Sequence, residues 1–382
     1  MKLLSMGKFV QKTNYRENAQ DYKTWTEMSN YFEKIYLIVL SPDKEWHHQE
    51  CEKLDITWIP KVTKPLEFIY FTYASYRKGL ELVRDNGIDV LNVGEPLGAG
   101  LAALGIKKKF KKPLVVQIQG QLFNLPKTYN WLRRVLVKGI AKFVTKRADR
   151  VRVVSEEIKK TVVENGIEEK KVFVSPSRCD TEQFNPKRYI TDVAQIKSTL
   201  GYDDDDIVIV FVGRLVVGKD VSSVLKALSK VVKRYQNIRF LIVGDGDVRE
   251  SLEQETRDLS LTNYVSFYGA VNYDEVPKML AVGDIFVSPS WDEGMPRAVL
   301  EAMSMGLATI VTPVGGNPEI IDDGENGYFV DVKAPEQIAE KILLLLDNSS
   351  LLEEVRANAR KKIVEKYEMK KCIESFAKIH FL

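Results

Sequence analysis

The sequence predicts an α/β protein built from two doubly wound, Rossmann-like domains, and three observations support this fold class. The chain has 382 residues, which is more than one hydrophobic core usually holds and suits two domains. Near-continuous apolar runs alternate with helical patterns, which is typical of parallel sheets covered on both faces. A polar, proline-bounded stretch without periodicity, residues 176–192, separates the two halves, so we expect a linker near 180–195.

Apolar runs rich in β-branched residues have the length and composition of strands. In the first half they are 36–40, 89–93, 113–119, 149–155 and 171–177, and in the second half 207–213, 238–246, 264–269, 284–290 and 308–314. We therefore expect an N-terminal domain over 1–185, a C-terminal domain over 190–365, and a terminal helix at about 366–382 that packs back onto the first domain. Ligands of such sheets bind at the carboxyl ends of the strands, so two facing domains would enclose a cleft there.

The composition narrows the class of protein. The apolar and charged fractions, 45% and 29%, are those of a globular chain. Cys51, Cys179 and Cys372 are scattered, so they indicate neither a disulfide framework nor a zinc site and are typical of a reducing cytosol. The sequence does not open on a signal-peptide pattern, and its apolar runs are shorter than the roughly 18 residues of a membrane span. We therefore expect a cytoplasmic protein.

Positive charge is concentrated in one segment. The whole chain carries a net charge of +3, whereas residues 105–160 hold 16 basic and 3 acidic side chains. Within it, residues 127–147 predict a helix with an apolar stripe and cations mostly off that stripe. The stripe consists of Leu132, Val135, Leu136, Ile140, Phe143 and Val144.

Two interpretations of this helix remain open. It either packs on the core with solvated cations, or docks on the anionic inner leaflet of the membrane, where each cation contributes about 1 kcal/mol. The run KKKFKK, residues 107–112, favours the membrane. Nucleic acid is not an expected partner, because the sequence contains no recognition module and no aromatic-lined basic sheet face.

Two cations follow the first strand of the second half. Arg214 and Lys219 come after residues 207–213, where Gly213 permits a tight exit, and they would clamp a diphosphate leaving group or remain as solvated loop cations. After residues 238–246 the dinucleotide fingerprint is incomplete, because Arg249 occupies its last glycine position. Nicotinamide-dinucleotide binding is therefore disfavoured.

The stretch WDEGMPRAVLEAMSMG, residues 291–306, carries two glutamates eight positions apart. Pro296 suits the first turn of a helix, and Gly294 lets the backbone pass close to an anionic ligand. Glu293 would lie on the loop rim and accept hydrogen bonds from sugar hydroxyls. Glu301 would lie about two turns inside the helix, where a carboxylate is costly unless ribose hydroxyls or an internal ion pair satisfy it.

Other polar groups give weaker indications. Gly315 and Gly316 either leave their amides free for a ligand or only form a turn. The run Asp203–Asp206 precedes a strand, at the end opposite the cleft, and the pair His47-His48 lacks a metal-ligand spacing. No metal site is expected.

The motifs of the second half, in their order, resemble those of the retaining glycosyltransferases of family 4, which have the GT-B fold. The matching segments are GRLVVGKD, VGDGDVRESLE, VSFYGAV, DIFVSPSWDEGMPRAVLEAMSMGLATIVTPVGGNPEII and NGYFV. Glu293 and Glu301 match the Glu-x7-Glu motif of the family. The match is strong over about residues 200–335 and looser upstream.

The resemblance implies roles for the motif residues. Glu293, Arg214 and Lys219 would serve catalysis, the two cations by neutralising the diphosphate, and Glu301 would hold the nucleotide ribose. The remaining donor-binding residues would be Gly213, Gly294, Met295, Pro296, Gly269, Ala270 and Val271, the last three beside the base. On the acceptor side the resemblance points to Gln119 and Gly120. The donor would be a nucleotide-sugar, UDP- or GDP-linked, with no further cofactor.

Departures from the family pattern lie mostly on the acceptor and linker side. Residues 7–18 lack the usual paired glycines, Gln119 stands where many members carry histidine, and residues 177–180 replace an Asn-Gly-x-Asp motif. On the donor side, Asp220 takes a frequent glycine position and Met295 a frequent phenylalanine position. The resemblance implies retaining sugar transfer, and the basic excess of residues 105–160 favours a lipid-linked or cell-surface glycan precursor as the acceptor. A soluble acceptor, or a catalytically silent sugar-nucleotide-binding protein, remains the alternative.

Overall fold

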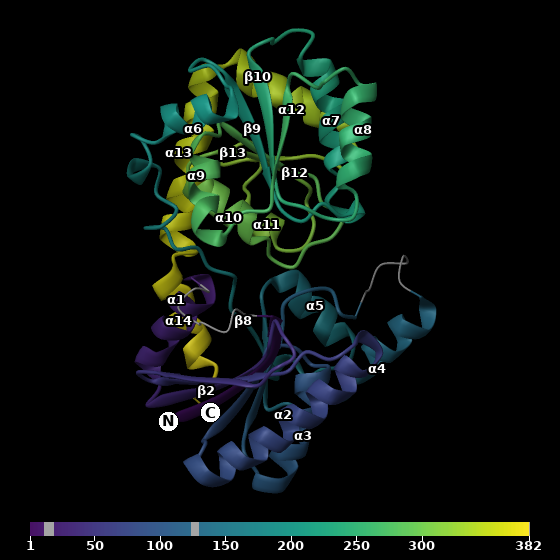
Figure 1. Cartoon of the computed structure of the whole chain (residues 1–382), viewed down its shortest axis with the longest axis vertical. Coiled ribbons are helices and arrows are strands. Elements are labelled where there is room, and N and C mark those ends of the chain that lie inside the picture. Colours follow the sequence, from purple (N-terminus) through teal and green to yellow (C-terminus); the bar gives the residue numbers. More distant parts are fainter. Residues whose placement is uncertain (11–18, 124–129, 382) are drawn as a thin grey trace. The chain divides into compact units, whose positions relative to one another are not determined.

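The computed structural model of the chain describes residues 1–10, 19–123 and 130–381. The chain forms two compact units (Figure 1). One comprises Met1–Pro176 and the C-terminal segment from Lys370, and the other comprises Ser177–Met369. Each unit is built around a largely parallel sheet flanked by helices, which confirms the predicted fold class.

The first unit contains an eight-stranded sheet in the order β3-β4-β2-β1-β5-β6-β7-β8. Its strands are β1 (Lys2–Val10), β2 (Lys34–Leu40), β3 (His47–Cys51), β4 (Leu54–Ile59), β5 (Val90–Val93), β6 (Leu114–Ile118), β7 (Arg150–Val153) and β8 (Val172–Val174). Its helices are α1 (Ala19–Met28), α2 (Lys64–Asn86), α3 (Gly98–Phe110), α4 (Trp131–Arg147), α5 (Glu156–Glu164) and α14 (Met369–Lys378). The strand order reverses between β1 and β5, so the topological switch point of this unit lies there.

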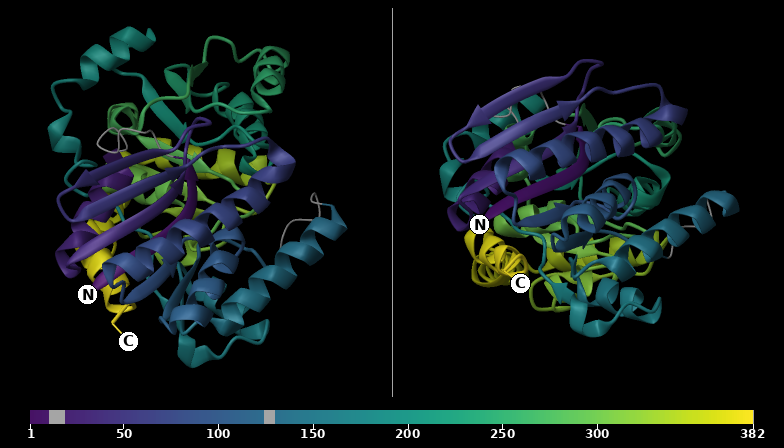
Figure 2. Two further views of the ribbon diagram at one scale, coloured as in Figure 1. Left: turned by 60° about the horizontal axis from the view of Figure 1, so that its bottom comes forward. Right: turned by 90° about the horizontal axis from the view of Figure 1, so that it is seen from below.

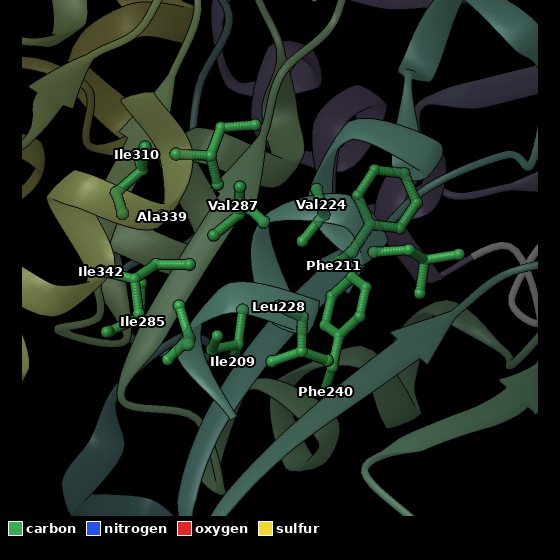
Figure 3. Close-up of a cluster of buried hydrophobic side chains, with 14 of the residues drawn as sticks. Ile209, Phe211, Val224, Leu228, Phe240, Ile285, Val287, Ile310, Ala339 and Ile342 are labelled. Carbon is green, nitrogen blue, oxygen red and sulfur yellow. The ribbon is translucent and has the colours of Figure 1, made fainter. Parts of the chain in front are cut away.

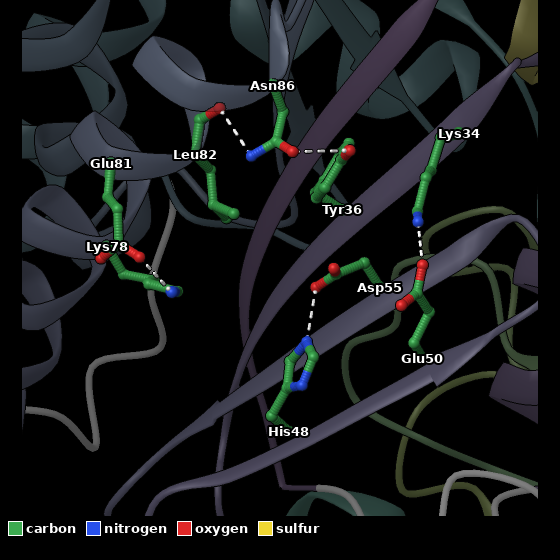
Figure 4. A network of polar contacts seen from close by, with 9 residues as sticks. All are labelled: Lys34, Tyr36, His48, Glu50, Asp55, Lys78, Glu81, Leu82 and Asn86. Atoms are coloured by element: carbon green, nitrogen blue, oxygen red, sulfur yellow. Dashed lines mark hydrogen bonds and ion pairs between the residues drawn. The ribbon is translucent and has the colours of Figure 1, made fainter.

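The hairpin β3–β4 forms the antiparallel edge of this sheet and was not among the predicted strands. The sequence HHQEC is too polar to be recognised as a strand, and ion pairs stabilise it instead (Figure 4). His48 Nε2 lies 3.1 Å from a carboxylate oxygen of Asp55, and Lys34 of β2 pairs with Glu50. The hairpin histidines therefore serve as hydrogen-bond partners of carboxylates, since His47 likewise contacts Asp43 at 2.9 Å.

The second unit contains a six-stranded sheet in the order β11-β10-β9-β12-β13-β14. Its strands are β9 (Ile207–Val212), β10 (Ile238–Val243), β11 (Val265–Gly269), β12 (Ile285–Ser288), β13 (Ala308–Val311) and β14 (Tyr328–Phe329). Its helices are α6 (Val193–Leu200), α7 (Val221–Val231), α8 (Arg249–Asp258), α9 (Val276–Ala281), α10 (Arg297–Ser304), α11 (Asn317–Ile320), α12 (Pro335–Asp347) and α13 (Ser349–Lys366). The order is that of a dinucleotide-type doubly wound sheet, with its switch point between β9 and β12.

The core of the second unit lies between this sheet and the helices α7 and α12 (Figure 3). Phe211 of β9 and Phe240 of β10 are fully buried beside Leu228 of α7. The near-continuous apolar run of β9 follows from this position, because a central parallel strand is covered on both faces. All ten predicted strands are present in the structure. The strands β1, β3, β4 and β14 were not among them.

The polar segment expected as a linker near 180–195 is packed into the second unit. Phe184 is fully buried, and its carbonyl oxygen accepts hydrogen bonds from Ser304 Oγ at 2.8 Å and Arg360 Nη1 at 3.0 Å. Phe184 thus anchors a segment whose polar composition is otherwise typical of a loop. The boundary between the units consequently falls at residues 176 and 177.

The C-terminal segment belongs to the first unit and covers a buried polar network. Asn92 of β5 donates to Ser5 at 2.8 Å, and its carbonyl oxygen lies 3.1 Å from His380 Nε2. Gln117 of β6 bridges Asn92 and Arg152, and the Arg152 guanidinium lies 4.7 Å from the Phe376 ring of α14. No helix within the described ranges is both long and apolar enough to cross a bilayer.

Candidate functional site

The candidate donor site lies at the switch point of the second unit. Loops 213–220 and 289–296 follow β9 and β12, which are neighbouring parallel strands, so both loops leave the same edge of the sheet. Ligands of doubly wound sheets bind where the strand order reverses. The sequence-predicted cations and the first glutamate are therefore at the expected place.

Glycines allow the segments that follow β9 and β10 to approach each other closely. Gly244 has a φ of +142°, and a Cβ there would lie only 2.9 Å from the carbonyl carbon of Gly213. The Gly213 amide donates to Val243 O at 3.0 Å. The glycines after β10 are thus needed for packing within the protein, in agreement with the turn interpretation.

Asp220 explains how the β9 loop departs from the family pattern. It has a φ of +52°, is 8% exposed, and directly precedes α7. Aspartate is one of the few residues that occupies this left-handed region readily. Its carboxylate accepts a hydrogen bond from Ser223 Oγ at 2.9 Å, which holds the turn that presents Lys219.

The β12 loop is held from two sides. The Trp291 amide donates to Gly218 O at 2.9 Å, and the Gly316 amide donates to Gly294 O at 2.6 Å. Gly315 has a φ of +59°, and a Cβ there would lie 2.7 Å from Gly294 O. The interpretation that the Gly316 amide is free for a ligand is therefore wrong, because this amide supports the loop that carries Glu293.

Lys219 and Glu293 form an ion pair across the switch point. Their side chains are 24% and 12% exposed. The pair is thus partly shielded from water, where charges interact more strongly than at the surface. Arg214 is exposed on the same loop and does not join the pair.

Met295 and Pro296 link the site to the start of the second unit. Met295 is 6% exposed, and its Sδ accepts a hydrogen bond from the Ser177 amide at 3.1 Å. Within the described ranges, the amides of Gly294 and Met295 donate no hydrogen bond. Pro296 occupies the capping position immediately before α10 rather than its first turn, since the helix begins at Arg297.

Glu301 is the most perturbed carboxyl group of the site. It is the fifth residue of α10, so it lies one turn inside the helix and not two. It is 5% exposed and accepts a hydrogen bond from Tyr273 Oη at 2.9 Å. Burial raises the pKa of Glu301 to about 7, although the Arg297 charge and the Tyr273 hydrogen bond act in the opposite direction.

The β11 exit meets α10 through Tyr273. Gly269, with a φ of +91°, accepts a hydrogen bond from the Gly244 amide at 2.8 Å, and Ala270 and Val271 follow it. The chain then reaches Tyr273, whose hydroxyl contacts Glu301. The three residues predicted beside the base therefore lie a few positions before the tyrosine that contacts the glutamate predicted to hold the ribose.

Sequence reasoning missed Tyr273. Burial and the neighbouring Glu301 charge raise its pKa, so the phenol remains a hydrogen-bond donor. Its ring packs on Phe184 with 5.8 Å between ring centroids. Tyr273 follows a strand, as Arg214 does, and this position could have marked it as a site residue. An aromatic residue at such a position is equally well explained by packing in the core.

The predicted acceptor-side residues lie in the first unit. Gln119 and Gly120 directly follow β6. Gln119 is exposed, and its side-chain amide donates to Gln117 Oε1 at 3.4 Å. Most of the glycine-poor segment 7–18 lies outside the described residues. In the part of the chain that the structure covers, no three His, Cys, Asp or Glu side chains form a potential metal site.

Comparisons with known proteins agree with this fold. Family models described as "Glycosyltransferase Family 4" and "Glycosyl transferases group 1" match residues 33–183 and 192–362. The two units have the GT-B fold. The chain belongs to the family 4 glycosyltransferases, as the sequence motifs predicted.

Individual relatives are matched over part of their length. A glycosyltransferase of Methanocaldococcus jannaschii is 36% identical over 45% of this chain and 44% of its own. The sulfoquinovosyl transferase of Arabidopsis thaliana is 29% identical over 73% of this chain and 54% of its own. The chain thus spans about half the length of these relatives. The Anabaena HepE structure in complex with UDP-glucose is 16% identical, covers 99% of this chain and 98% of its own, and has a TM-score of 0.79.

Proposed function

We propose that the protein transfers a sugar, with retention of anomeric configuration, from a nucleoside-diphosphate sugar to an acceptor hydroxyl. The observation that carries this proposal is the arrangement at the second switch point. Lys219 and Glu293 form an ion pair between two loops at one edge of the second sheet. The buried carboxylate of Glu301 lies in the helix that follows the second of these loops. The HepE structure of the same fold holds UDP-glucose, which supports the class of donor.

The proposed chemistry breaks the bond between the sugar C1 and the β-phosphate oxygen. A bond from C1 to the acceptor oxygen forms on the same face, and the acceptor proton passes to the departing phosphate. Lys219 and Arg214 stabilise the charge that develops on the diphosphate, and Glu293 orients the sugar hydroxyls. The proposal assigns the neutralising role to these cations, so it includes no metal or cofactor besides the UDP- or GDP-sugar.

The acceptor is proposed to be a lipid-linked or cell-surface glycan precursor, met by a cytoplasmic protein that binds peripherally at the inner leaflet. The basic excess of residues 105–160 supports this choice. If the acceptor is soluble instead, activity will be insensitive to both salt and lipid. Gln119 and Gly120 remain the proposed acceptor-side residues.

A catalytically silent sugar-nucleotide-binding protein is the second candidate. The observation that favours it is that Lys219 and Glu293 neutralise each other in this structure. Donor turnover separates the two candidates. We expect Glu293→Ala to lower turnover by about 100-fold or more while nucleotide binding persists. Nucleotide binding without donor turnover in the wild type would favour the silent protein.

A thermal-shift panel is the first test of the donor site. UDP, GDP, ADP and NAD would each be added with magnesium or with EDTA. A ligand at about 100 times its Kd stabilises the fold by roughly 2.7 kcal/mol, which is a measurable shift. Stabilisation by one nucleoside diphosphate that survives EDTA supports the proposal, whereas a shift with NAD alone contradicts it.

A further inference from the structure

Helix α4 exposes much of its predicted apolar stripe. Only Ala141, Val144 and Thr145 of this helix are buried. The exposed apolar side chains are Trp131 (71%), Leu132 (51%), Val135 (59%), Leu136 (55%) and Phe143 (47%). Figure 2 shows the N-terminal half of α4 reaching outward from the helices of the first unit. Core packing therefore explains only the C-terminal half of the helix.

A second exposed apolar stripe lies on α2. Leu66, Ile69 and Tyr73 are 59%, 64% and 60% exposed. Their spacing of three and four residues places them on one face of the helix. Two helices of the same unit thus expose large apolar side chains, which is unusual for a surface without a partner.

An apolar groove runs between these two helices. It has a volume of about 710 Å³, within the range of small-molecule sites. Its apolar walls are Phe68 and Phe71 from α2, Leu97 at the start of α3, and Leu136, Val137 and Ile140 from α4. This lining suits a hydrocarbon chain and offers few polar partners to a sugar.

The inner end of the groove reaches the switch point of the first sheet. Glu95, which also lines the groove, follows β5 directly, and the strand order reverses between β1 and β5. Its carboxylate accepts hydrogen bonds from the Leu97 amide at 2.5 Å and the Ala99 amide at 2.8 Å. A chain lying in the groove would therefore bring its polar head to the strand edge where such sheets bind ligands.

The charge around the groove matches an anionic lipid surface. Arg133 of α4 lines the groove itself. Arg134, Lys138 and Lys142 lie on another face of the same helix, where Lys138 is exposed. The surrounding segment 105–160 holds 16 basic and 3 acidic side chains. Cations beside an apolar surface favour a lipid phosphate over a neutral apolar partner.

We propose that the groove between α2 and α4 binds one hydrocarbon chain of the acceptor lipid, whose uncharged polar head lies at the β5 edge. This rests on the proposed transferase function and names its acceptor as an amphiphile. In this proposal the exposed side chains of α2 and α4 enter the membrane leaflet around the groove, among them Leu66, Ile69 and Trp131. The membrane-binding surface therefore extends beyond residues 105–160.

A direct binding assay tests the groove. A dansyl-labelled fatty acid is titrated into the full-length protein and displaced with dodecyl phosphate. We expect saturable binding, weakened about tenfold in Phe68→Ser/Leu136→Ser, which opens the groove, and in Val137→Trp, which fills it. The matched control is Leu344→Ser/Val364→Ser, two residues that are each 39% exposed in the second unit, and it should bind as the wild type does. Equal affinity in the wild type and both groove variants would overturn the proposal.

A vesicle assay separates the groove from the surrounding charge. Arg134→Gln/Lys138→Gln/Lys142→Gln should lose flotation with phosphatidylglycerol vesicles and keep fatty-acid binding. The control Lys187→Gln/Lys233→Gln/Lys361→Gln should float as the wild type does. If the protein floats equally with phosphatidylglycerol and phosphatidylcholine vesicles, the proposed binding of its basic surface to anionic lipid is contradicted.

A nucleotide readout distinguishes failure of this inference from failure of the proposed function. The UDP and GDP thermal shifts are recorded for every variant and should not change. If a nucleotide stabilises the wild type but the fatty acid does not bind, the lipid-binding role of the groove is contradicted and the proposed donor site is not. If the fatty acid binds but no nucleotide stabilises the wild type, the groove remains and the donor proposal falls.

Discussion

Glu301 places a titrating group where the nucleotide is proposed to bind. Burial raises its pKa from 4.5 to about 7, so the folded protein holds more protons than the unfolded chain between these values. The free energy of unfolding therefore falls as the pH rises through this window. A ribose that donates hydrogen bonds to the carboxylate would offset part of this loss.

We expect nucleoside-diphosphate affinity to rise as the pH increases from about 6 to 8, because only the charged carboxylate accepts with both oxygens. Titration calorimetry at three pH values checks this result. Glu301→Gln should bind more weakly and without the pH dependence. The same slope in the variant would show that another group titrates.

Tyr273 is expected to set where Glu301 titrates. Its hydrogen bond lowers the pKa of this carboxyl group, so Tyr273→Phe should move the midpoint of the affinity profile upward by about one pH unit, which corresponds to about 1.4 kcal/mol. A purely structural tyrosine would change the melting temperature without moving the midpoint. The two readouts should therefore be measured on the same samples.

At the scale of elements, the loop after β13 supports the loop after β12. Gly315→Ala should destabilise the protein by about 2 kcal/mol and lower donor turnover, because the new Cβ strains a left-handed residue and collides with Gly294 O. Denaturant unfolding and turnover assays check this. Gly139→Ala is the control, because a Cβ there meets no atom within 4 Å. Equal stability of the two variants would contradict the packing argument.

The sequence predicted elements best where the local pattern matched the tertiary environment. Eight of the ten predicted strands are of this kind, because central parallel strands are buried on both faces, whereas β8 and β11 lie at sheet edges and are only partly buried. The hairpin β3–β4 escaped prediction, since its polar residues are stabilised by cross-strand ion pairs. Residues 180–195 were misread for a similar reason: the burial of Phe184 depends on distant residues of α10 and α13.

The site was predictable as a set of positions and not as a set of contacts. Motif order placed Lys219 and Glu293 in the loops after two strands and Glu301 inside the following helix, as the structure shows. Spacing along the chain contains no information on which residue meets which across the sheet. The Tyr273–Glu301 hydrogen bond and the Lys219–Glu293 ion pair therefore required the strand order.

At the scale of the whole molecule, His380 links acidity to the attachment of the C-terminal segment. Burial lowers its pKa from 6.5 to about 4, with contributions from Arg152 and Arg150. The unfolded chain thus holds more protons in this window, and stability is lost as the pH falls from about 6.5 to about 4. The full loss is about 3 kcal/mol.

Thermal unfolding measured across this pH range should show the loss in the wild type. His380→Gln should remove most of the pH dependence while keeping a hydrogen bond to Asn92. An unchanged slope in the variant would assign the acid sensitivity to other groups.

The residues from Lys370 onward complete a unit that begins at Met1. During synthesis the ribosome delivers the amino acids in order, so β1 to β8 emerge while the segment that covers Asn92 and Arg152 has not yet been made. The first half must therefore wait, with a polar patch open to water, until the second half has been translated. The segment from Lys370 onward therefore acts as the closing step in the assembly of this unit, and a stop codon that precedes it would harm the half of the protein that was made first.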